Sequence, residues 1–179
     1  MMEITLDEKS VKVAEELLGK SRDQVNRASY AAINRTLPKV RKLLVSETDA
    51  HYVAKKGAVR ASLRIIRAGS GDPTGMVKSS GSPLPLKIFQ TRFPKTRMAS
   101  ARVLRTHGLR PVKGLFRQNG RIFQRRQPAR YPLAVPMGPS APQMVGRDES
   151  VQKIIPEISA YLNQRFTHEI AFRFKGLGG

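Results

Sequence analysis

The positive charge of this chain is concentrated in its middle third, and that concentration limits how the chain can fold. Residues 71–147 carry 15 Lys and Arg and one Asp, whereas residues 1–70 carry 14 against 8 acids and residues 148–179 carry 4 against 4. A surface of one sign repels itself and disfavours the compact state unless an anionic partner or counterions meet it. We therefore expect a partner at the middle third, with nucleic acid, an acidic protein and solvent ions as the alternatives.

The remaining composition indicates one globular domain over 1–179 with a modest core. The chain is 40% apolar, but aromatics reach only 6% and Trp is absent. It contains no Cys, so neither a disulfide framework nor a thiolate metal site is expected. The first residues lack the pattern of a signal peptide, and no stretch approaches the roughly 20 apolar residues of a membrane span. We expect a protein made in the cytoplasm, with no membrane partner.

Helical periodicity dominates the helical part, residues 1–68. A short amphipathic helix is predicted over 7–19, and a long, bent helix follows, with apolar residues repeating at helical spacing over 25–44. Pro38 is expected to kink this long helix or to end it near Leu37, because proline offers no N–H to the helix and clashes with the preceding turn.

Two further helices are predicted. The first spans about Thr48–Ala68 and carries a basic row beside its apolar face. The second occupies the last part of the chain, 148–179, and is expected to start afresh near Ile155, where Pro156 suits a first turn. The apolar face of this terminal helix is Ile155, Ile158, Leu162, Phe166 and Ile170. The basic row is Lys56, Arg60, Arg64 and Arg67, and it is either a solvated helix face or a contact with an anionic partner.

The segment between the helical parts is rich in turn and strand signals. Residues 69–85 are dense in Gly, Ser and Pro and are expected to form a flexible loop. Residues 86–147 alternate apolar and basic side chains over short stretches, which predicts a basic, β-rich part. Within it, "KGLFRQNGRIFQRR" predicts a β-hairpin that turns at Asn119-Gly120 and has one apolar and one arginine face. The side chains expected on the apolar face are Leu115, Ile122 or Phe123.

A proline-rich segment, "YPLAVPMGPSAP" at 131–142, follows the hairpin. It cannot form a central strand, because proline has no N–H to donate to the ladder. We expect either an extended arm that docks on a neighbouring subunit or an edge segment folded against its own sheet. The candidate docking residues are Tyr131, Leu133, Val135 and Met137. The predicted class is α+β: N-terminal helices, a small antiparallel sheet with a basic hairpin and an arm, and a C-terminal helix.

No residue pattern typical of catalysis occurs. The three histidines, His51, His107 and His168, are too far apart for an HxxxH or HExxH pattern, and there is no GxSxG. The middle third has Asp72 as its one carboxylate, whereas an enzyme needs a positioned acid, base, nucleophile or metal. We therefore expect a protein that is not an enzyme and that uses no cofactor or metal.

The arginines in and after the hairpin are the first candidates for a functional surface. Arginine can neutralise the phosphates of nucleic acid, and it can also form bidentate pairs with the carboxylates of an acidic protein. No helix-turn-helix, zinc finger or aromatic RNA-binding motif accompanies them, so sequence-specific recognition is not expected. This arginine surface is Arg117, Arg121, Arg125, Arg126 and Arg130, and the basic row is the second candidate.

Several of these segments resemble the bacteriophage minor tail protein Z family, the tail completion proteins. The resemblance begins with "ASYAAINRT" at 28–36 and "VSETDAHYVAKKGAVRASLRIIRA" at 45–68. It continues in the same order with the basic "NGRIFQRR", then "RYPLAVPMGPSAPQMV", then "IPEISAYLNQRFTHEIAFRF". It spans most of the chain, and "AAINRT" followed by a basic helix and later "YPLAVP" is its most specific part.

The resemblance implies a structural virion protein. Proteins of this family act at the head-proximal end of a phage tail, where the tail is completed and joined to the head. Parts in this region work as rings, so a homo-oligomer, commonly a hexameric ring, is implied. The implied partners are the tail terminator, the tail tube and the head connector, with genome DNA in the lumen, and the implied locations are the virion and, during assembly, the host cytoplasm. The alternative function is a non-specific nucleic-acid-binding protein of ribosomal or nucleoid type.

Overall fold

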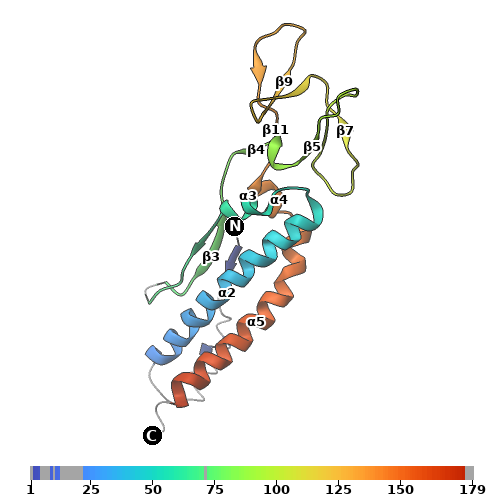
Figure 1. Ribbon diagram of the computed structural model, residues 1–179. Helices are drawn as coiled ribbons and strands as arrows, with labels where there is room; N and C mark the ends of the chain where they lie inside the picture. Colours follow the sequence, from blue (N-terminus) through green and yellow to red (C-terminus); the bar gives the residue numbers. More distant parts are fainter. Residues whose placement is uncertain (1, 5–8, 10, 13–21, 71, 176–179) are drawn as a thin grey trace. The chain divides into compact units, whose positions relative to one another are not determined.

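Helices and short antiparallel strands make up the computed structural model, which describes residues 2–4, 9, 11–12, 22–70 and 72–175 (Figure 1). The predicted α+β class is confirmed. The predicted helix over 7–19 falls mostly outside the described residues. The helices are α2 (Arg22–His51), α3 (Lys56–Ala61), α4 (Ala141–Val145) and α5 (Asp148–Lys175), with a 3-10 turn η1 (Leu86–Ile88). The strands are β1 (Met2–Ile4), β2 (Leu63–Ile66), β3 (Gly75–Ser79), β4 (Pro83–Pro85), β5 (Gln90–Arg92), β6 (Ser100–Arg102), β7 (Arg110–Pro111), β8 (Leu115–Gln118), β9 (Arg121–Arg125), β10 (Leu133–Ala134) and β11 (Met137–Ser140).

The chain divides into two compact units. Unit 1 consists of Met1–Leu44, Leu63–Ser79 and Asp148–Gly179, and unit 2 of Val45–Ser62 and Ser80–Arg147. Both units are therefore assembled from segments that are separate in the sequence, and neither is a contiguous piece of the chain. Helix α2 begins in unit 1 and ends in unit 2.

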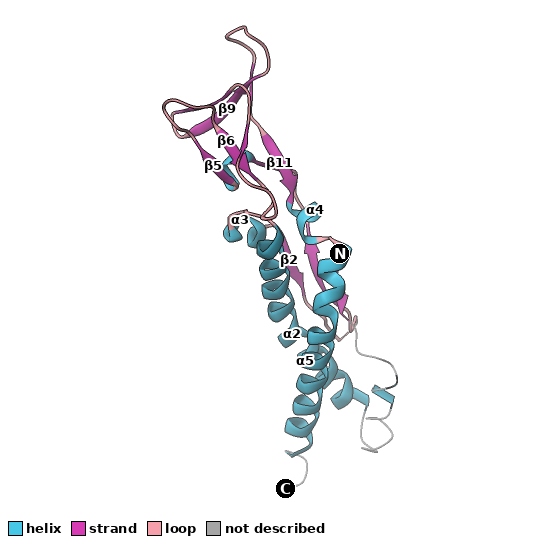
Figure 2. Cartoon of the chain, turned by 90° about the vertical axis from the view of Figure 1, so that its right-hand side faces the viewer, coloured by secondary structure: helices cyan, strands magenta, loops and turns pink. Residues whose placement is uncertain are grey.

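Unit 1 is built around α5 and the unit 1 part of α2, which lie side by side (Figures 1 and 2). Two ion pairs link these helices: Arg35 Nη1 lies 2.7 Å from Glu169 Oε1, and Lys39 Nζ lies 3.0 Å from Glu157 Oε1. The apolar line predicted for α2 is confirmed as its buried face, with every member at most 3% exposed. Its residues are Val25, Ala28, Ala32, Ile33, Leu37, Val40 and Leu44.

The expected long helix is confirmed, since α2 has 30 residues and continues through Pro38. Of the two alternatives expected at this proline, a kink or an end near Leu37, the end is therefore wrong. A proline inside a helix costs about 3 kcal/mol, through the lost hydrogen bond and the clash with the preceding turn. Leu37 and Val40, on either side of it, are completely buried, and burying side chains of this size contributes about 1.5–3 kcal/mol each. Burial of the side chains on either side of Pro38 therefore outweighs the cost of the proline, and the helix continues.

Helix α5 begins at Asp148, not near the predicted Ile155, and Pro156 lies inside it. Its first turn is acidic, which suits the positive end of the helix dipole. The predicted apolar face is shifted at its start, because Ile154 is buried whereas Ile155 is 39% exposed. The rest of the face is confirmed: Ile158, Leu162 and Phe166 are buried, and Ile170 is half-buried.

The predicted helix over Thr48–Ala68 is wrong for most of its length. Helix α2 supplies its beginning, α3 is a separate short helix, and β2 replaces its last part. Strand β2 pairs antiparallel with β3, placing Ile65 opposite Val77. The β-branched residues of β2 favour this extended pairing, and its partner is the next strand of the chain, which begins after residues 67–74.

Residues 69–85 were expected to form a flexible loop, and this expectation is wrong for the residues of β3 and β4. Strand β3 is the central strand of the order β1-β3-β2, and its Val77 is 2% exposed. The amide of Asn34 in α2 also fixes the backbone of Ala68, since Nδ2 donates to the Ala68 carbonyl and Oδ1 accepts from its N–H, both at 2.9 Å.

Gly75 is where β3 approaches α2 most closely. A Cβ at this position would overlap Ile33 Cγ2 and lie 3.2 Å from Leu37 Cδ1. Gly75→Ala is expected to lower the free energy of unfolding by about 1–2 kcal/mol, because a methyl group would be forced into a filled core. Urea titration measures this change. Gly57→Ala in α3 is the control: with nothing within 4 Å it should leave stability equal or slightly higher, and equal stability of the Gly75 variant would contradict the proposed contact.

Unit 2 contains three small antiparallel sheets, with strand orders β10-β9-β8, β5-β6-β7 and β11-β4 (Figure 2). The predicted hairpin is confirmed as β8–β9. Its turn residues Asn119 and Gly120 have positive φ angles of 49° and 72°, the left-handed backbone that this turn requires. The apolar core of this unit includes Val59, Leu86, Phe89, Ala101, Leu115, Ile122, Ala141, Met144 and Val145.

Candidate functional site

Unit 2 carries most of the net charge of the chain. It has 17 Lys and Arg against two acids, Glu47 and Asp49, a balance of 17 − 2 = +15 within the total of +20. Unit 1 has 16 Lys and Arg against 11 acids, a balance of 16 − 11 = +5. Residues 80–147 contain no Asp or Glu at all. The negative charge that neutralises this surface in a complex must therefore come largely from a partner or from solvent ions.

The hairpin does not separate its apolar side chains from its arginines as predicted. Cross-strand partners share a face, and side chains alternate along a strand. Arg117 lies opposite Ile122 and therefore on the face that also carries buried Leu115. The opposite face carries Phe116 and Phe123, which pair directly. Arg121 and Arg125 share that second face, and all three hairpin arginines are exposed.

Aromatic contacts hold part of the arginine surface in place. The rings of Phe116 and Phe123 are 5.9 Å apart between centroids, a tilted aromatic pair. The Arg125 guanidinium lies 5.0 Å above the Phe116 ring, and that of Arg130 lies 6.0 Å from the Tyr131 ring. Such cation–π contacts contribute about 0.5–1 kcal/mol at exposed sites. They restrict the guanidinium groups without neutralising them.

The remaining predicted residues of this region follow β9. Arg126 and Arg130 are exposed and lie beyond the end of that strand. Two strands of the proline-rich segment pair within their own unit. Strand β10 pairs with β9, where Leu133 lies opposite Arg125, and β11 pairs with β4, where Met137 lies opposite Pro85. Three of the predicted docking residues remain open to solvent: Tyr131 is 67% exposed, Val135 48% and Met137 55%. The segment is thus an edge of its own sheets that still presents apolar side chains.

The basic row does not form one helix face, because the helix predicted to carry it does not exist as a single element. Lys56 and Arg60 lie on α3 in unit 2. Arg64 lies in β2 and Arg67 just beyond it, both in unit 1. The expectation of four aligned cations is therefore wrong, and only the first two share an element.

Asp49 links three segments of unit 2, a role that no sequence pattern predicted. Its Oδ2 lies 3.1 Å from Lys56 Nζ, and its Oδ1 accepts a hydrogen bond of 2.8 Å from Arg105 Nη2. Arg105 Nε also donates to the Asp49 carbonyl. Burial raises the pKa of the Asp49 carboxyl, but the hydrogen bonds and charges of Lys56 and Arg105 outweigh that effect, so its pKa lies below the ordinary value. Lys56 is therefore engaged in part within its own unit.

Asp49→Asn is expected to destabilise the protein by about 1 kcal/mol at pH 7, since it removes the charge shared by two partly exposed cations. A lowered folded-state pKa contributes stability above the unfolded value of about 3.9, and this contribution is lost as the pH falls through the folded value. Urea titrations should therefore show wild type and variant differing at pH 7 and converging below about pH 4. A difference that persists undiminished in acid would contradict this role of Asp49.

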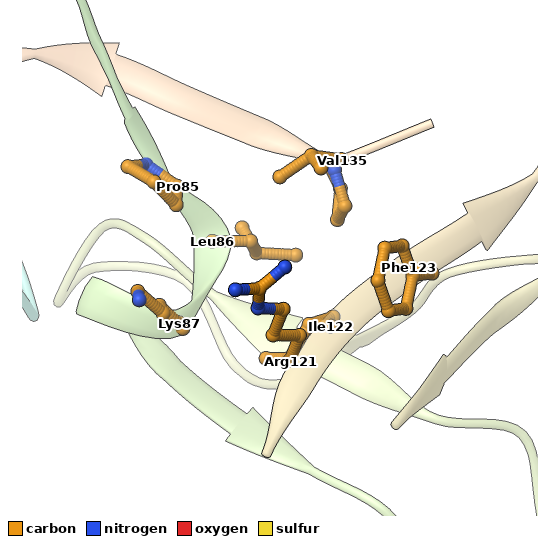
Figure 3. Close-up of a pocket in the computed structure, with 8 residues that line it drawn as sticks. Pro85, Leu86, Lys87, Arg121, Ile122, Phe123 and Val135 are labelled. Carbon is orange, nitrogen blue, oxygen red and sulfur yellow. The ribbon is translucent and has the colours of Figure 1, made fainter. Parts of the chain in front are cut away.

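A pocket of about 220 Å³ opens in unit 2 between η1, β9 and the proline-rich segment (Figure 3). Its apolar wall includes Leu86, Ile122, Phe123, Val135 and Pro136. Arg121 and Lys87 supply its positive charge. In Figure 3 the Arg121 side chain extends between Lys87 and Phe123. Sequence reasoning did not identify this pocket, because its wall joins three segments that are far apart in the chain.

Within the residues that the structure describes, no group of three or more His, Cys, Asp or Glu lies close enough to hold a metal ion. His51 ends α2, His107 follows β6, and His168 lies exposed on α5. Across those same parts of the chain, every helix is too short or too polar to cross a membrane.

Three observations therefore define the candidate site: the charge of unit 2, the arginine surface with its aromatic contacts, and the pocket beside it. Comparisons of the chain with protein-family models, with curated proteins and with solved structures give no match.

Proposed function

We propose that this chain is a structural protein of a tailed bacteriophage, a ring-forming tail completion or neck component that joins the head-proximal end of the tail to the head connector. The resemblance of "AAINRT", "NGRIFQRR" and "YPLAVP", in that order, to tail completion proteins supports this proposal. Its partners would be further copies of itself, the tail terminator, the tail tube and the connector, within the virion and, before that, in the host cytoplasm.

The observation that carries the proposal is the uneven charge of the two units. Unit 2 holds +15 of the net charge, and its edge segment presents Tyr131, Val135 and Met137 to solvent. A one-signed surface with apolar side chains at its edge suits an interface formed by charge and shape complementarity, because the partner supplies the missing sign. Its role would be to bind other proteins, with no chemical step.

The proposal is tested in the phage that encodes the chain. Disrupting the gene is expected to leave filled heads and tails that do not join, and supplying the protein in trans is expected to restore joining. Electron microscopy of lysates, with plaque counts, reads out both effects. Joined, infectious particles at normal yield without the protein would overturn the proposal.

One observation favours a second function, non-specific binding of nucleic acid. Phe116, Phe123 and Arg125 form an aromatic and cationic face that could stack on bases and contact phosphates. A protein of this kind should bind duplex or single-stranded DNA as a purified chain, with an affinity that falls steeply as salt rises. A joining protein should bind DNA weakly when purified. Two half-buried rings make a small stacking surface, so we favour the joining function.

A further inference from the structure

We propose that the pocket between η1 and β9 receives an apolar side chain from an acidic segment of a partner protein, whose carboxylates pair with Lys87 and Arg121. This inference rests on the proposed joining function and deepens it, since it assigns both the chemistry of a partner and the place where it binds. It also selects acidic protein over DNA as the partner at this position.

The size of the pocket suits a single side chain. At about 220 Å³ it lies below the roughly 300–1,000 Å³ that is usual for small-molecule sites. It is nevertheless much larger than the space of one water molecule, which occupies about 30 Å³ in the liquid. One leucine, methionine or phenylalanine side chain is therefore a better match than a cofactor or a nucleotide.

The apolar part of the wall favours an apolar occupant over a polar one. Leu86 and Ile122, 7% and 8% exposed, face the pocket together with Val135 and Pro136, and these side chains offer neither donors nor acceptors. A nucleobase placed against these four side chains would leave the polar groups that face them without partners, which costs about 1–3 kcal/mol per group. An aliphatic side chain loses no hydrogen bond on entry and gains about 1.5–3 kcal/mol from burial.

The two cations that line the pocket specify what must flank that side chain. Lys87 and Arg121 are both exposed, and no carboxylate lines the pocket, since residues 80–147 contain none. A guanidinium forms bidentate pairs with carboxylates, and a lysine ammonium adds a second contact. Both units of a second copy are net positive, at +5 and +15, so charge complementarity points to an acidic segment of a different protein.

The test uses the purified full chain and a fluorescent peptide with one central leucine flanked by aspartates. Fluorescence anisotropy is expected to show binding at least about tenfold tighter than for the same peptide with glycine in place of leucine. Lys87→Glu with Arg121→Glu should weaken binding of the leucine peptide at least about tenfold. The matched control is Lys95→Glu with Arg97→Glu, which reverses the same amount of charge at exposed residues of unit 2 outside the pocket. It should change the affinity for the leucine peptide less than about threefold.

The position of the peptide is read by replacing its leucine with the photoreactive diazirine analogue. Cross-links are expected within 85–87, 121–123 and 135–136. Equal binding of the leucine and glycine peptides, equal losses in the two charge-reversed variants, or cross-links scattered over unit 2 would each overturn the inference. The inference would also be overturned if a DNA oligonucleotide displaced the peptide and if Lys87→Glu with Arg121→Glu weakened the binding of that DNA. None of these outcomes changes the result of the gene-disruption experiment, so failure of the pocket and failure of the joining function are distinguishable.

Discussion

Neutralising the arginine surface is expected to reduce the yield of infectious phage about 100-fold. The variant carries Gln at all five positions of that surface. Exposed ion pairs contribute about 0.2–1 kcal/mol each, so five of them supply about 1–5 kcal/mol per subunit. In a ring every subunit repeats these contacts, and repeated contacts add through avidity. The loss of infectious phage should therefore exceed that expected for one interface. Plaque counts after the disrupted gene is complemented with the variant measure this loss.

The control for this variant removes the same charge from unit 1. It replaces Lys12, Arg27, Arg41, Lys42 and Lys78 with Gln, all of them exposed or half-exposed residues outside unit 2. This variant should keep its yield within about threefold of wild type, because isolated surface charges contribute little. Both proteins should fold, since no substituted side chain is buried. Equal yields from the two variants would show that the arginine surface has no special role.

Pro38→Ala is expected to stabilise the protein by about 2 kcal/mol. Proline inside a helix costs about 3 kcal/mol relative to alanine, and the substitution restores an N–H that can donate to the Asn34 carbonyl one turn earlier. Alanine also gives the unfolded chain more freedom, which lowers stability by about 0.4–1 kcal/mol. The first effect is larger, so the net change is a gain. Pro38 is exposed, so the substitution leaves no cavity in the core.

Pro73→Ala is the control for this prediction. Pro73 is exposed and lies outside any helix or strand, so the change acts mainly through the unfolded state and should lower stability by about 0.4–1 kcal/mol. Urea titrations of the two variants should therefore move in opposite directions. A Pro38 variant that is less stable than wild type would contradict the view that burial of Leu37 and Val40 maintains the helix against the proline.

Local signals predicted the elements that depend on neighbouring residues alone. Asn119-Gly120 determined the hairpin turn, because few residues other than glycine and asparagine readily adopt the positive φ angles found there. The apolar line of α2 was predictable because helical spacing places those side chains on one face. Both features arise from residues that are close in sequence.

The errors occurred where strand pairing or tertiary packing outweighed the local helical pattern. Residues 63–66 had a helical pattern but pair with β3, which itself lies in a segment rich in loop-forming residues. Pro38 would end an isolated helix, but buried side chains on both sides of it sustain α2. The residues of the basic row lie on different elements for the same reason, since α3 and β2 replace the single helix predicted to carry them.

The candidate site was predictable in composition but only in part in geometry. Counting charges was enough to locate the cationic region, and the hairpin pattern identified Arg117, Arg121 and Arg125 as its centre. The two-residue turn at Asn119-Gly120 sets the strand register that groups Arg121 and Arg125 with the two phenylalanines, so this part of the geometry could also have been predicted. The pocket depends on three non-adjacent segments, so no local pattern could reveal it.

The central claim, that unit 2 is a mating surface within a tailed phage particle, is tested most directly by mass spectrometry of intact virions. Particles purified on a density gradient from the phage that encodes this chain should contain its peptides, and isolated tails or necks should be enriched in them relative to emptied heads. Complete absence of the polypeptide from infectious particles would contradict the claim.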